Sequence, residues 1–480
     1  MPDTRATAQH ESVQESLKRV VELLHKHELV EALVHKQNMP RHDLVQQLVH
    51  KQNLAELQKT LDALHPADVA YILEALPLDQ RLVVWDLLRA ERDGEILLEV
   101  SDAVRESLIA SMDSNELRAA AEQLDTDEIA DLAPDLPHEV IQDVFESLDK
   151  EEQAQLQSAL SYPEGTVGAL MDFDMVTIRE DISLEAVLAD LRKLGELPSH
   201  TDKLFVVDNM EKLRGVLPLK RLLLSKPEAL VSTVMSDDPV IFNGNDKASD
   251  AASAFERYDL VTAPVVDAQH KLIGRLTVDE VMDFIRDEAE SDVLAMAGLR
   301  EEEDMFASVW KSMQNRWTWL AINLVTAFIA SRVIGAFEGS IEKIVALAAL
   351  MPIVAGIGGN SGNQTTTMIV RGLALGQIHP SNMRKLFIKE LGVSLMNGLI
   401  WGSILGLLAA LLYHNAALGA VMTGAMTLNL LLAAVMGVLI PLAMHKLGRD
   451  PAVGSSVMIT AMTDSGGFFI FLGLATIFLL

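Results

Sequence analysis

The sequence contains no cysteine, and that absence excludes disulfide bonds, thiolate-bound zinc and cysteine nucleophiles. Basic residues are also scarce, with 39 Lys and Arg against 68 Asp and Glu and a net charge of −29. Because phosphate binding needs a positive surface, this balance argues against nucleic acid as a partner. A nucleophile with an adjacent base, a phosphate loop and a hydrolase metal motif are all missing, so we do not expect an enzyme.

The few basic residues are unevenly distributed. From residue 310 onward there are ten Lys and Arg and five Asp and Glu, which leaves 29 basic and 63 acidic residues before it. The chain therefore joins an acidic, water-soluble front to a lipid-soluble back. Residues 1–14 are polar and lack the apolar core of a secretory signal, so we expect the front to stay in the cytoplasm.

Five apolar segments follow residue 310, and each reaches the roughly 20 residues that a helix needs to cross about 30 Å of hydrocarbon. Eight basic residues lie on one side of a five-span path, and only Arg332 and Lys343 lie on the other. Positive charge favours the cytoplasmic side, which predicts a cytoplasmic N-terminus and an external Leu480. The predicted spans are 317–337, 341–370, 386–413, 417–444 and 453–480.

The first 160 residues carry leucines at helical spacing. A Leu-Pro pair at 76–77 recurs at 136–137, within two stretches that align at an offset of 60. This repeat predicts an all-α solenoid of short stacked helices. Seven of the 13 histidines lie within the first 65 residues, and they fit a solvated helix face better than a zinc site, because the ligand spacing of a known site is missing.

From residue 168 to about residue 284 a strand, helix, strand, strand, helix pattern occurs twice. Phe-Val-Val-Asp at 205–208 and Pro-Val-Val-Asp at 264–267 are matching copies. The pattern resembles a tandem CBS pair, an α/β module. Such pairs often bind adenine nucleotides through a Gly-hydrophobic-hydrophobic-Thr-x-x-Asp segment. The second copy keeps Thr277 but has Glu280 in place of the Asp, and these two residues are the candidate contacts for ATP or another adenine nucleotide.

An acidic stretch joins this module to the first span. Its carboxylates include Asp283, Asp287, Glu288, Glu290 and Asp292. One interpretation is a solvated connecting helix. The other is a cation site, because like charges on one surface repel unless a cation lies between them, and carboxylate oxygens are the ligands that Mg²⁺ and Ca²⁺ prefer.

Asp464 lies 11 residues into the last apolar segment, which contains no basic residue. Ionisable groups in hydrocarbon are costly and are functional candidates for that reason. We therefore interpret Asp464, next to Thr463, as a cation ligand in a wet cavity, with a protonated or packing role as the alternative. Glu390, beside Lys389 near a span end, is expected to be an interfacial charge.

The second apolar segment contains a polar run that begins at Gly358. Glycines let helices approach closely, so helix packing explains part of the run. It does not explain Asn360, Asn363 and Gln364, since buried amides need hydrogen-bonding partners. Amide oxygens and N–H groups suit the waters of a hydrated ion, and the run therefore predicts the wall of a pore.

These features together resemble the MgtE family of magnesium channels, from about residue 30 to the end. The most specific parts are the run 352–364, Pro-Ile-Val-Ala-Gly-Ile-Gly-Gly-Asn-Ser-Gly-Asn-Gln, and the Thr463-Asp464 pair. The resemblance implies a homodimer in the bacterial inner membrane, with a pore on the two-fold axis and Asp464 as the pore carboxylate. It also implies that the connecting helix acts as a plug that closes the pore when cytosolic Mg²⁺ binds.

The resemblance further implies a set of cytosolic Mg²⁺ ligands in the acidic front. Ser291 stands where relatives carry an acid, so the match is incomplete there. The implied ligands are Asp279, Glu280, Asp283, Glu288 and Asp292, with a weaker match at Asp127, Asp131 and the carbonyl of Gly168.

The predicted organisation is a helical solenoid at 1–165, a tandem CBS pair at 166–285, an acidic connecting helix at 286–312 and a five-span membrane domain at 313–480. The leading functional hypothesis is a Mg²⁺-selective channel closed by cytosolic Mg²⁺. A cation-coupled secondary divalent-metal transporter or exporter with the same carboxylate is the alternative, and a nucleotide-regulated membrane protein is the third. The sequence leaves the choice among Mg²⁺, Mn²⁺, Co²⁺ and Ca²⁺ open.

Overall fold

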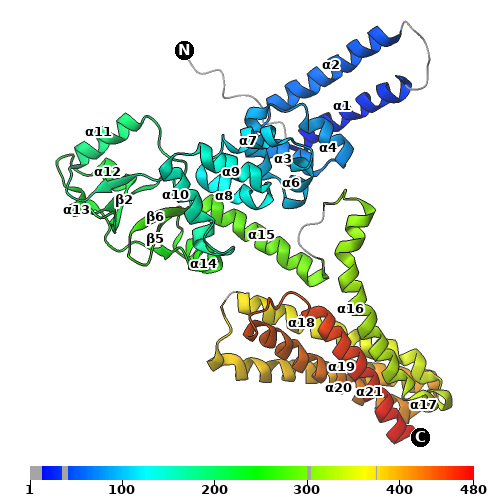
Figure 1. Cartoon of the computed structure of the whole chain (residues 1–480). Helices are drawn as coiled ribbons and strands as arrows, with labels where there is room; N and C mark the ends of the chain where they lie inside the picture. The colour runs from blue at the N-terminus through cyan, green and yellow to red at the C-terminus, as the bar shows by residue number, and fades with distance from the viewer. Residues whose placement is uncertain (1–12, 35–41, 300–303, 375) are drawn as a thin grey trace. The chain divides into compact units, whose positions relative to one another are not determined.

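The computed structural model describes residues 13–34, 42–299, 304–374 and 376–480 (Figure 1). The chain divides into two compact units. The first comprises Met1–Glu288 with Asp304–Ala307, and the second comprises Ala289–Glu303 with Ser308–Leu480. Helix α15 (Val278–Ala297) runs from the first unit into the second, so the predicted boundary at 285/286 falls inside one continuous helix.

The N-terminal part of the first unit is helical. Two long helices, α1 (Val13–Val34) and α2 (His42–Asp62), precede eight short ones. Several short helices begin at an Asp that accepts backbone N–H groups and pairs with a Glu three residues later, as at Asp113 and Glu116. The all-α prediction is confirmed, and the solenoid stacking stays a prediction. The short helices are α3 (Pro66–Glu74), α4 (Leu78–Trp85), α5 (Asp93–Glu99), α6 (Asp102–Ile109), α7 (Ser114–Ala121), α8 (Thr126–Leu132), α9 (His138–Ser147) and α10 (Lys150–Ala159).

Two three-stranded sheets of identical topology follow. In each, the first strand pairs parallel with the second and the second pairs antiparallel with the third. Apolar side chains of both sheets, among them Phe205 and Val266, share one core, which confirms the tandem CBS pair. The elements are β1 (Thr177–Arg179), α11 (Leu184–Leu194), β2 (Lys203–Val207), β3 (Leu213–Pro218), α12 (Leu219–Leu224), α13 (Val231–Val234), β4 (Phe242–Asn243), α14 (Ala248–Tyr258), β5 (Thr262–Val266) and β6 (Leu272–Thr277).

Matching glycines in the two sheets leave room for a neighbouring backbone. A Cβ on Gly215 would overlap the carbonyl oxygen of Ser236, and a Cβ on Gly274 would lie 3.0 Å from the carbonyl oxygen of Asp172. Both approaches accompany isolated bridges, from Val216 to Ser236 and from Asp172 to Arg275. The repeated Leu-x-Gly pattern thus reflects a steric requirement as well as a sequence copy.

The second unit is a bundle of long apolar helices. Four described helices are long and apolar enough to cross a membrane: α16 (Val309–Gly335), α19 (Pro380–Tyr413), α20 (Ala416–Lys446) and α21 (Ser455–Leu479). Helix α18 (Ala346–Ala374) has 29 residues and packs against α20 and α21, but its polar run lowers its mean hydropathy. The prediction of five spans is therefore not confirmed. A short helix, α17 (Glu338–Lys343), precedes α18.

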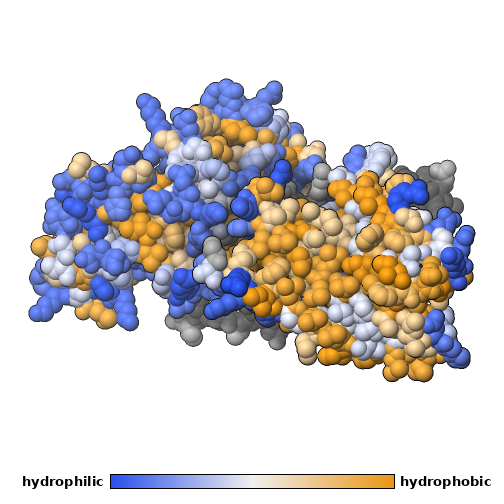
Figure 2. Space-filling model, turned by 90° about the horizontal axis from the view of Figure 1, so that it is seen from below, coloured by the Kyte–Doolittle hydropathy of each residue, from blue (hydrophilic) through white to orange (hydrophobic). Residues whose placement is uncertain are grey.

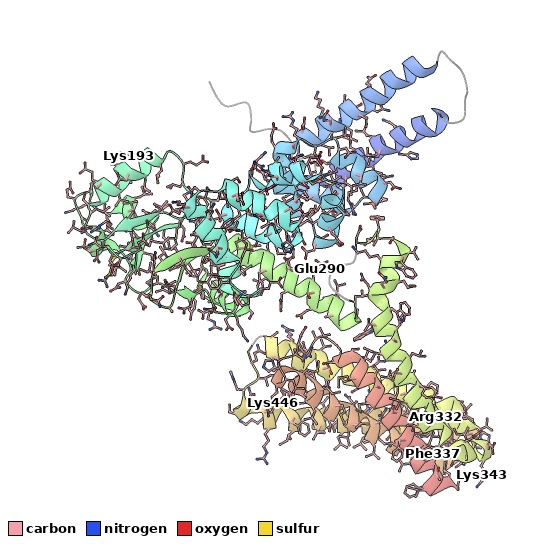
Figure 3. All side chains as sticks on the ribbon, viewed as in Figure 1. Lys193, Glu290, Arg332, Phe337, Lys343 and Lys446 are labelled. Atoms are coloured by element: carbon pink, nitrogen blue, oxygen red, sulfur yellow. The ribbon has the colours of Figure 1, made fainter. Side chains whose placement is uncertain are left out.

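The surface of this bundle suits a membrane. Figure 2 shows a broad, largely apolar surface over the long helices. Large apolar side chains such as Phe328, Leu411 and Ile477 lie exposed on α16, α19 and α21. Figure 3 shows Arg332 and Lys343 at one end of the bundle and Lys446 at the other, as the charge pattern predicts.

A pair of reporter fusions distinguishes five spans from four. We expect a reporter after Leu480 to lie outside the cell, because α18 supplies the fifth crossing. A reporter in the turn at Val345, after α16, should also lie outside and serves as the control for expression. A cytoplasmic signal at Leu480 with an external signal at Val345 would mean that α18 does not cross.

Candidate functional site

Helices α18 and α21 meet at the predicted ion pathway. A Cβ on Gly359 would lie 3.6 Å from Thr463 Oγ1, and a Cβ on Gly362 would lie 2.5 Å from a methyl group of Ile459. Thr463 is fully buried, and its hydroxyl donates to the carbonyl of Ile459 at 2.9 Å. The glycines of the polar run therefore serve close packing, and the structure brings Thr463 against the α18 motif.

The remaining predicted pathway residues differ in exposure. Asn360 and Gln364 lie exposed on α18, whereas Asn363 is partly buried and its Oδ1 has no hydrogen-bond partner in the part of the chain that the structure describes. Asp464 is partly buried on α21 and forms no salt bridge within the described residues. These carboxylate and amide oxygens keep the capacity to accept hydrogen bonds from the water shell of an ion.

The sequence analysis missed Asn429 on α20. Its side chain is fully buried, its Nδ2 donates to the carbonyl of Val354 at 2.9 Å, and its Oδ1 is a buried acceptor without a partner among the described residues. A Cβ on Gly358 or Gly467 would overlap its amide. Glycines of α18 and α21 thus make room for one polar side chain of α20. The sequence feature that could have identified Asn429 is an isolated amide side chain within an apolar span.

Glu390 on α19 is buried within the protein. The residue is 3% exposed, and its place at the membrane interface stays a prediction. Its Oε2 accepts a long hydrogen bond of 3.4 Å from Thr365 of α18, and its Oε1 lies 3.1 Å from Lys389 Nζ. The burial of Glu390 could not be predicted from its neighbour Lys389, because the sequence does not show which face of α19 packs on α18.

A second group of acids lies in the first unit, where α8 approaches the start of α15. We call Asp127, Asp131, Asp172 and Glu280 the acidic cluster. Burial, followed by Asp131 and Asp127, raises the pKa of Glu280 to about 8. Burial and then Asp172 raise the pKa of Asp127 to about 7, and burial raises that of Asp131 to about 6 against the opposing charge of Arg105. These shifts show carboxylates that are buried away from water and lie close to other acids.

One arginine pairs directly with the acidic cluster. Arg275 contacts Asp172 at 2.6 Å. The fold brings together three predicted metal ligands from α8 and α15, which are Asp127, Asp131 and Glu280. The charges of Asp127 and Asp131 raise the pKa of Glu280. A ready-made group of three or more metal-ligating side chains is not found among the described residues. The cluster gathers carboxylates without forming a closed coordination shell.

The other predicted ligands in the first unit are three acids of α15 and Gly168. Asp279 Oδ2 lies 3.1 Å from His200 Nδ1, and its Oδ1 is buried without a hydrogen-bond partner among the described residues. Asp283 is exposed and lies 3.3 Å from Arg286. Glu288 is exposed on α15. Gly168 is buried, and a Cβ there would overlap the ring of Tyr162, so its backbone position requires glycine.

Asp292 lies in the second unit, near an acid that the sequence analysis did not single out. Burial and then the charge of Asp450, in the loop before α21, raise the pKa of Asp292. Ala295, one turn later in α15, is buried against Val370 and Ala452. The end of the connecting helix thus packs on α18 and on the loop that leads into α21, the helix of Asp464.

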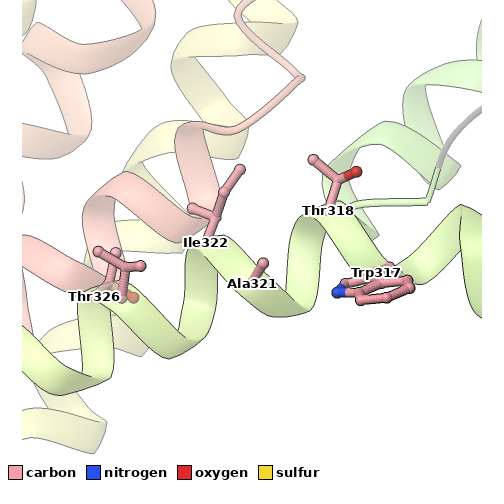
Figure 4. A pocket seen from close by; sticks show the side chains of 6 residues that line it. Trp317, Thr318, Ala321, Ile322 and Thr326 are labelled. Carbon is pink, nitrogen blue, oxygen red and sulfur yellow. The ribbon is translucent and has the colours of Figure 1, made fainter.

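The predicted nucleotide contacts, Thr277 and Glu280, lie outside two cavities of the structure. Thr277 is 2% exposed at the end of β6, and Glu280 lies in the acidic cluster, where negative charge opposes a phosphate. A cavity of about 590 Å³ occurs in the first CBS copy, lined by residues 174–177, 194 and 196–199. Another, of about 600 Å³, lies along α16 between Trp317 and Thr326 (Figure 4). Nucleotide binding at Thr277 stays a prediction.

Comparison with protein-family models gives matches in all three parts of the chain. Residues 351–474 match the MgtE model, described as a divalent cation transporter. Residues 64–165 match the MgtE intracellular N domain, and residues 167–227 and 231–287 match the CBS domain.

Curated relatives cover most of the chain. The chain is 26% identical over 424 residues to the magnesium transporter MgtE of Bacillus subtilis. The aligned residues cover 88% of this chain and 94% of that protein. The magnesium transporter MgtE of Thermus thermophilus is 28% identical over 433 residues, covering 88% and 95%. A solved cytosolic domain of the Mg²⁺ channel MgtE in complex with ATP is 28% identical, covering 50% of this chain and 98% of that one, with a TM-score of 0.45.

The raised pKa values predict that acid strengthens the contact between α8 and α15. A buried carboxyl with a raised pKa binds more protons in the packed state, so its contribution is present at low pH and is lost as pH rises through about 6 to 8. Without divalent cations, protease should therefore cut the segment between α10 and β1 of the full-length protein faster at about pH 9 than at about pH 6. Saturating Mg²⁺ should remove much of this difference.

Glu280→Gln is the matched variant, because it removes the carboxyl with the highest raised pKa and keeps the side-chain size. We expect it to weaken the pH dependence of cleavage. Unchanged pH dependence in Glu280→Gln combined with Asp127→Asn, or greater protection at high pH, would contradict the assignment.

Proposed function

Since this chain belongs to the MgtE family of divalent cation transporters, we propose that it carries Mg²⁺ across a lipid membrane. Members of the family are transporters and not enzymes. The observation that supports the proposal most directly is Asp464, a carboxylate without a salt bridge among the described residues, on an apolar helix that packs against the polar run of α18. The bacterial inner membrane, with the N-terminus in the cytoplasm and Leu480 outside, is part of the proposal.

We infer a channel that passes a largely hydrated ion. Mg²⁺ gives up its inner waters reluctantly, so oxygens that accept hydrogen bonds from those waters serve it better than a tight cage. Asp464 supplies negative charge, and Asn360, Asn363 and Gln364 supply neutral oxygens and N–H groups. Two copies of the chain would place two Asp464 carboxylates near one axis. A divalent ion between them relieves their repulsion better than a monovalent one.

Regulation by cytosolic Mg²⁺ is the second part of the proposal. Asp127, Asp131 and Glu280 fit a divalent cation, because they are buried together and because burial, followed for Glu280 and Asp127 by neighbouring acids, raises their pKa values. Asp279, Asp283, Glu288 and Asp292 extend this surface along α15. A bound cation would supply charge that offsets their repulsion and favours the packed state. Packing of α15 would then act on α18 and α21 through Ala295 and its neighbours.

Asp464→Ala tests the transport proposal. We expect Mg²⁺ uptake into liposomes to fall by at least about tenfold, which corresponds to about 1.4 kcal/mol, because the carboxylate of the pathway is lost. Asp464→Asn should retain little flux, since its amide is neutral. Glu342→Gln removes an exposed carboxylate of α17 and should leave uptake unchanged. Near wild-type uptake by correctly folded Asp464→Ala protein would overturn the pathway assignment.

Single-channel recording separates the channel from the alternative, a cation-coupled secondary transporter. Discrete current steps at fixed voltage are expected of a channel. Mg²⁺ uptake that depends on a second ion gradient, without such steps, would favour the transporter.

A further inference from the structure

Arg81 on α4 is a charged side chain with no exposed surface. Such burial is rare for arginine unless the guanidinium is paired. Three neutral groups hold it in place: its Nε donates to the carbonyl of Leu73 at 2.9 Å, its Nη2 to the carbonyl of Leu76 at 3.0 Å and its Nη1 to Ser107 Oγ at 3.2 Å. These groups come from α3, the turn after it and α6. The guanidinium is therefore oriented by the helical N-terminal part itself.

The remaining N–H groups of Arg81 bind a carboxylate from far along the chain. Nη1 lies 2.8 Å from Asp304 Oδ2, and Nη2 lies 3.1 Å from Asp304 Oδ1, in a two-pronged pair. The Asp304 side chain is 8% exposed. Its Oδ1 also accepts the backbone N–H of Phe306 at 2.9 Å. Asp304 follows α15 and precedes α16, yet residues 304–307 belong to the first compact unit.

We propose that Arg81, the carbonyls of Leu73 and Leu76 and the hydroxyl of Ser107 form a carboxylate-binding site, the Arg81 socket, whose occupant is Asp304. The socket fastens the segment that enters the first membrane helix to the helical N-terminal part. The three neutral partners satisfy hydrogen bonds of the guanidinium but do not neutralise its charge. A fully buried, unpaired arginine is strongly unfavourable, so the socket selects for an anion with two oxygens in one plane.

The length of the chain shows why this contact matters. From Ala297, the end of α15, to Ser308, the N-cap of α16, 11 residues can span at most about 40 Å. From Asp304 to Ser308, four residues can span at most about 14 Å. An occupied socket therefore fixes Asp304 and leaves only four residues of chain before the N-cap of α16. We infer that a displacement of Asp304 is passed to α16 through this short segment.

Rescue by a small carboxylate tests the socket in the full-length protein. Asp304→Ala empties it, and we expect the variant to unfold at a lower temperature than the wild type. Sodium formate should raise its midpoint by about 2 °C or more, because formate carries two oxygens in one plane. Sodium chloride at equal ionic strength should not, and formate should not stabilise the wild type.

Asp62→Ala provides the matched control. Asp62 pairs with Arg89 at the same 2.8 Å, but Arg89 is largely exposed, so water solvates it when the partner is removed. Formate should leave this variant unchanged. Equal effects of formate on Asp304→Ala and Asp62→Ala, or no effect on Asp304→Ala, would overturn the socket. Asp304→Asn keeps the side-chain shape and should respond to formate less than Asp304→Ala.

The coupling to α16 rests on the proposed function and has its own readout. In liposomes, Asp304→Ala should shift the cytosolic Mg²⁺ concentration that half-inhibits uptake by at least about threefold, whereas Asp62→Ala should not. Uptake with unchanged inhibition in Asp304→Ala would overturn the coupling while leaving the socket intact. A complete lack of Mg²⁺ uptake by the wild type would overturn the proposed function, and the formate experiment would still decide on the socket.

Discussion

The burial of carboxylates beside other acids is the constraint on which this account depends. The part of the chain before residue 310 carries 63 acidic and 29 basic residues. Where α8 meets α15, that excess is partly buried, and the raised pKa values of Asp127, Asp131 and Glu280 reflect the cost. Such a contact persists only if protons or cations occupy it. Under the proposed function, packing of the first unit therefore depends on the concentration of a divalent ion.

The membrane helices meet the same constraint in an apolar medium. Polar groups there are few, and each one shapes its surroundings. Gly358 and Gly467 lack a Cβ where the amide of Asn429 lies, and Gly359 and Gly362 let Thr463 approach α18. The polar run of α18 therefore contains both the glycines that allow close helix packing and the amides of the predicted pathway. Replacing one of these glycines would displace the neighbouring helix and disturb the predicted pathway.

Much of the fold followed from local patterns. The copied segments predicted two equal sheets, and the pairings of Val206 with Gly215 and Val265 with Gly274 occupy matching positions in them. Helical periodicity predicted the N-terminal helices. The number of spans did not follow, because the polar run that predicts the pathway also lowers the hydropathy of α18.

What the sequence could not predict are contacts between distant segments. Arg81 and Asp304 are 223 residues apart, and the sequence carries no pattern that pairs them. The approach of α8 to α15 likewise appears only in the fold, although the resemblance named Asp127, Asp131 and Glu280 as ligands. Asn429 and Glu390 were visible as polar residues in or near apolar spans, but their partners depend on which helix faces pack together.

Proton release on Mg²⁺ binding tests the central claim most directly. Ligands must lose their protons before they bind a metal, and Glu280 and Asp127 hold protons near neutrality because their pKa values are about 8 and about 7. Titrating the purified full-length protein with Mg²⁺ in weak buffer should release protons at about pH 7 and almost none at about pH 9. Glu280→Gln should release fewer. Mg²⁺ binding at about pH 7 without proton release, or equal release from Glu280→Gln combined with Asp127→Asn, would contradict the account.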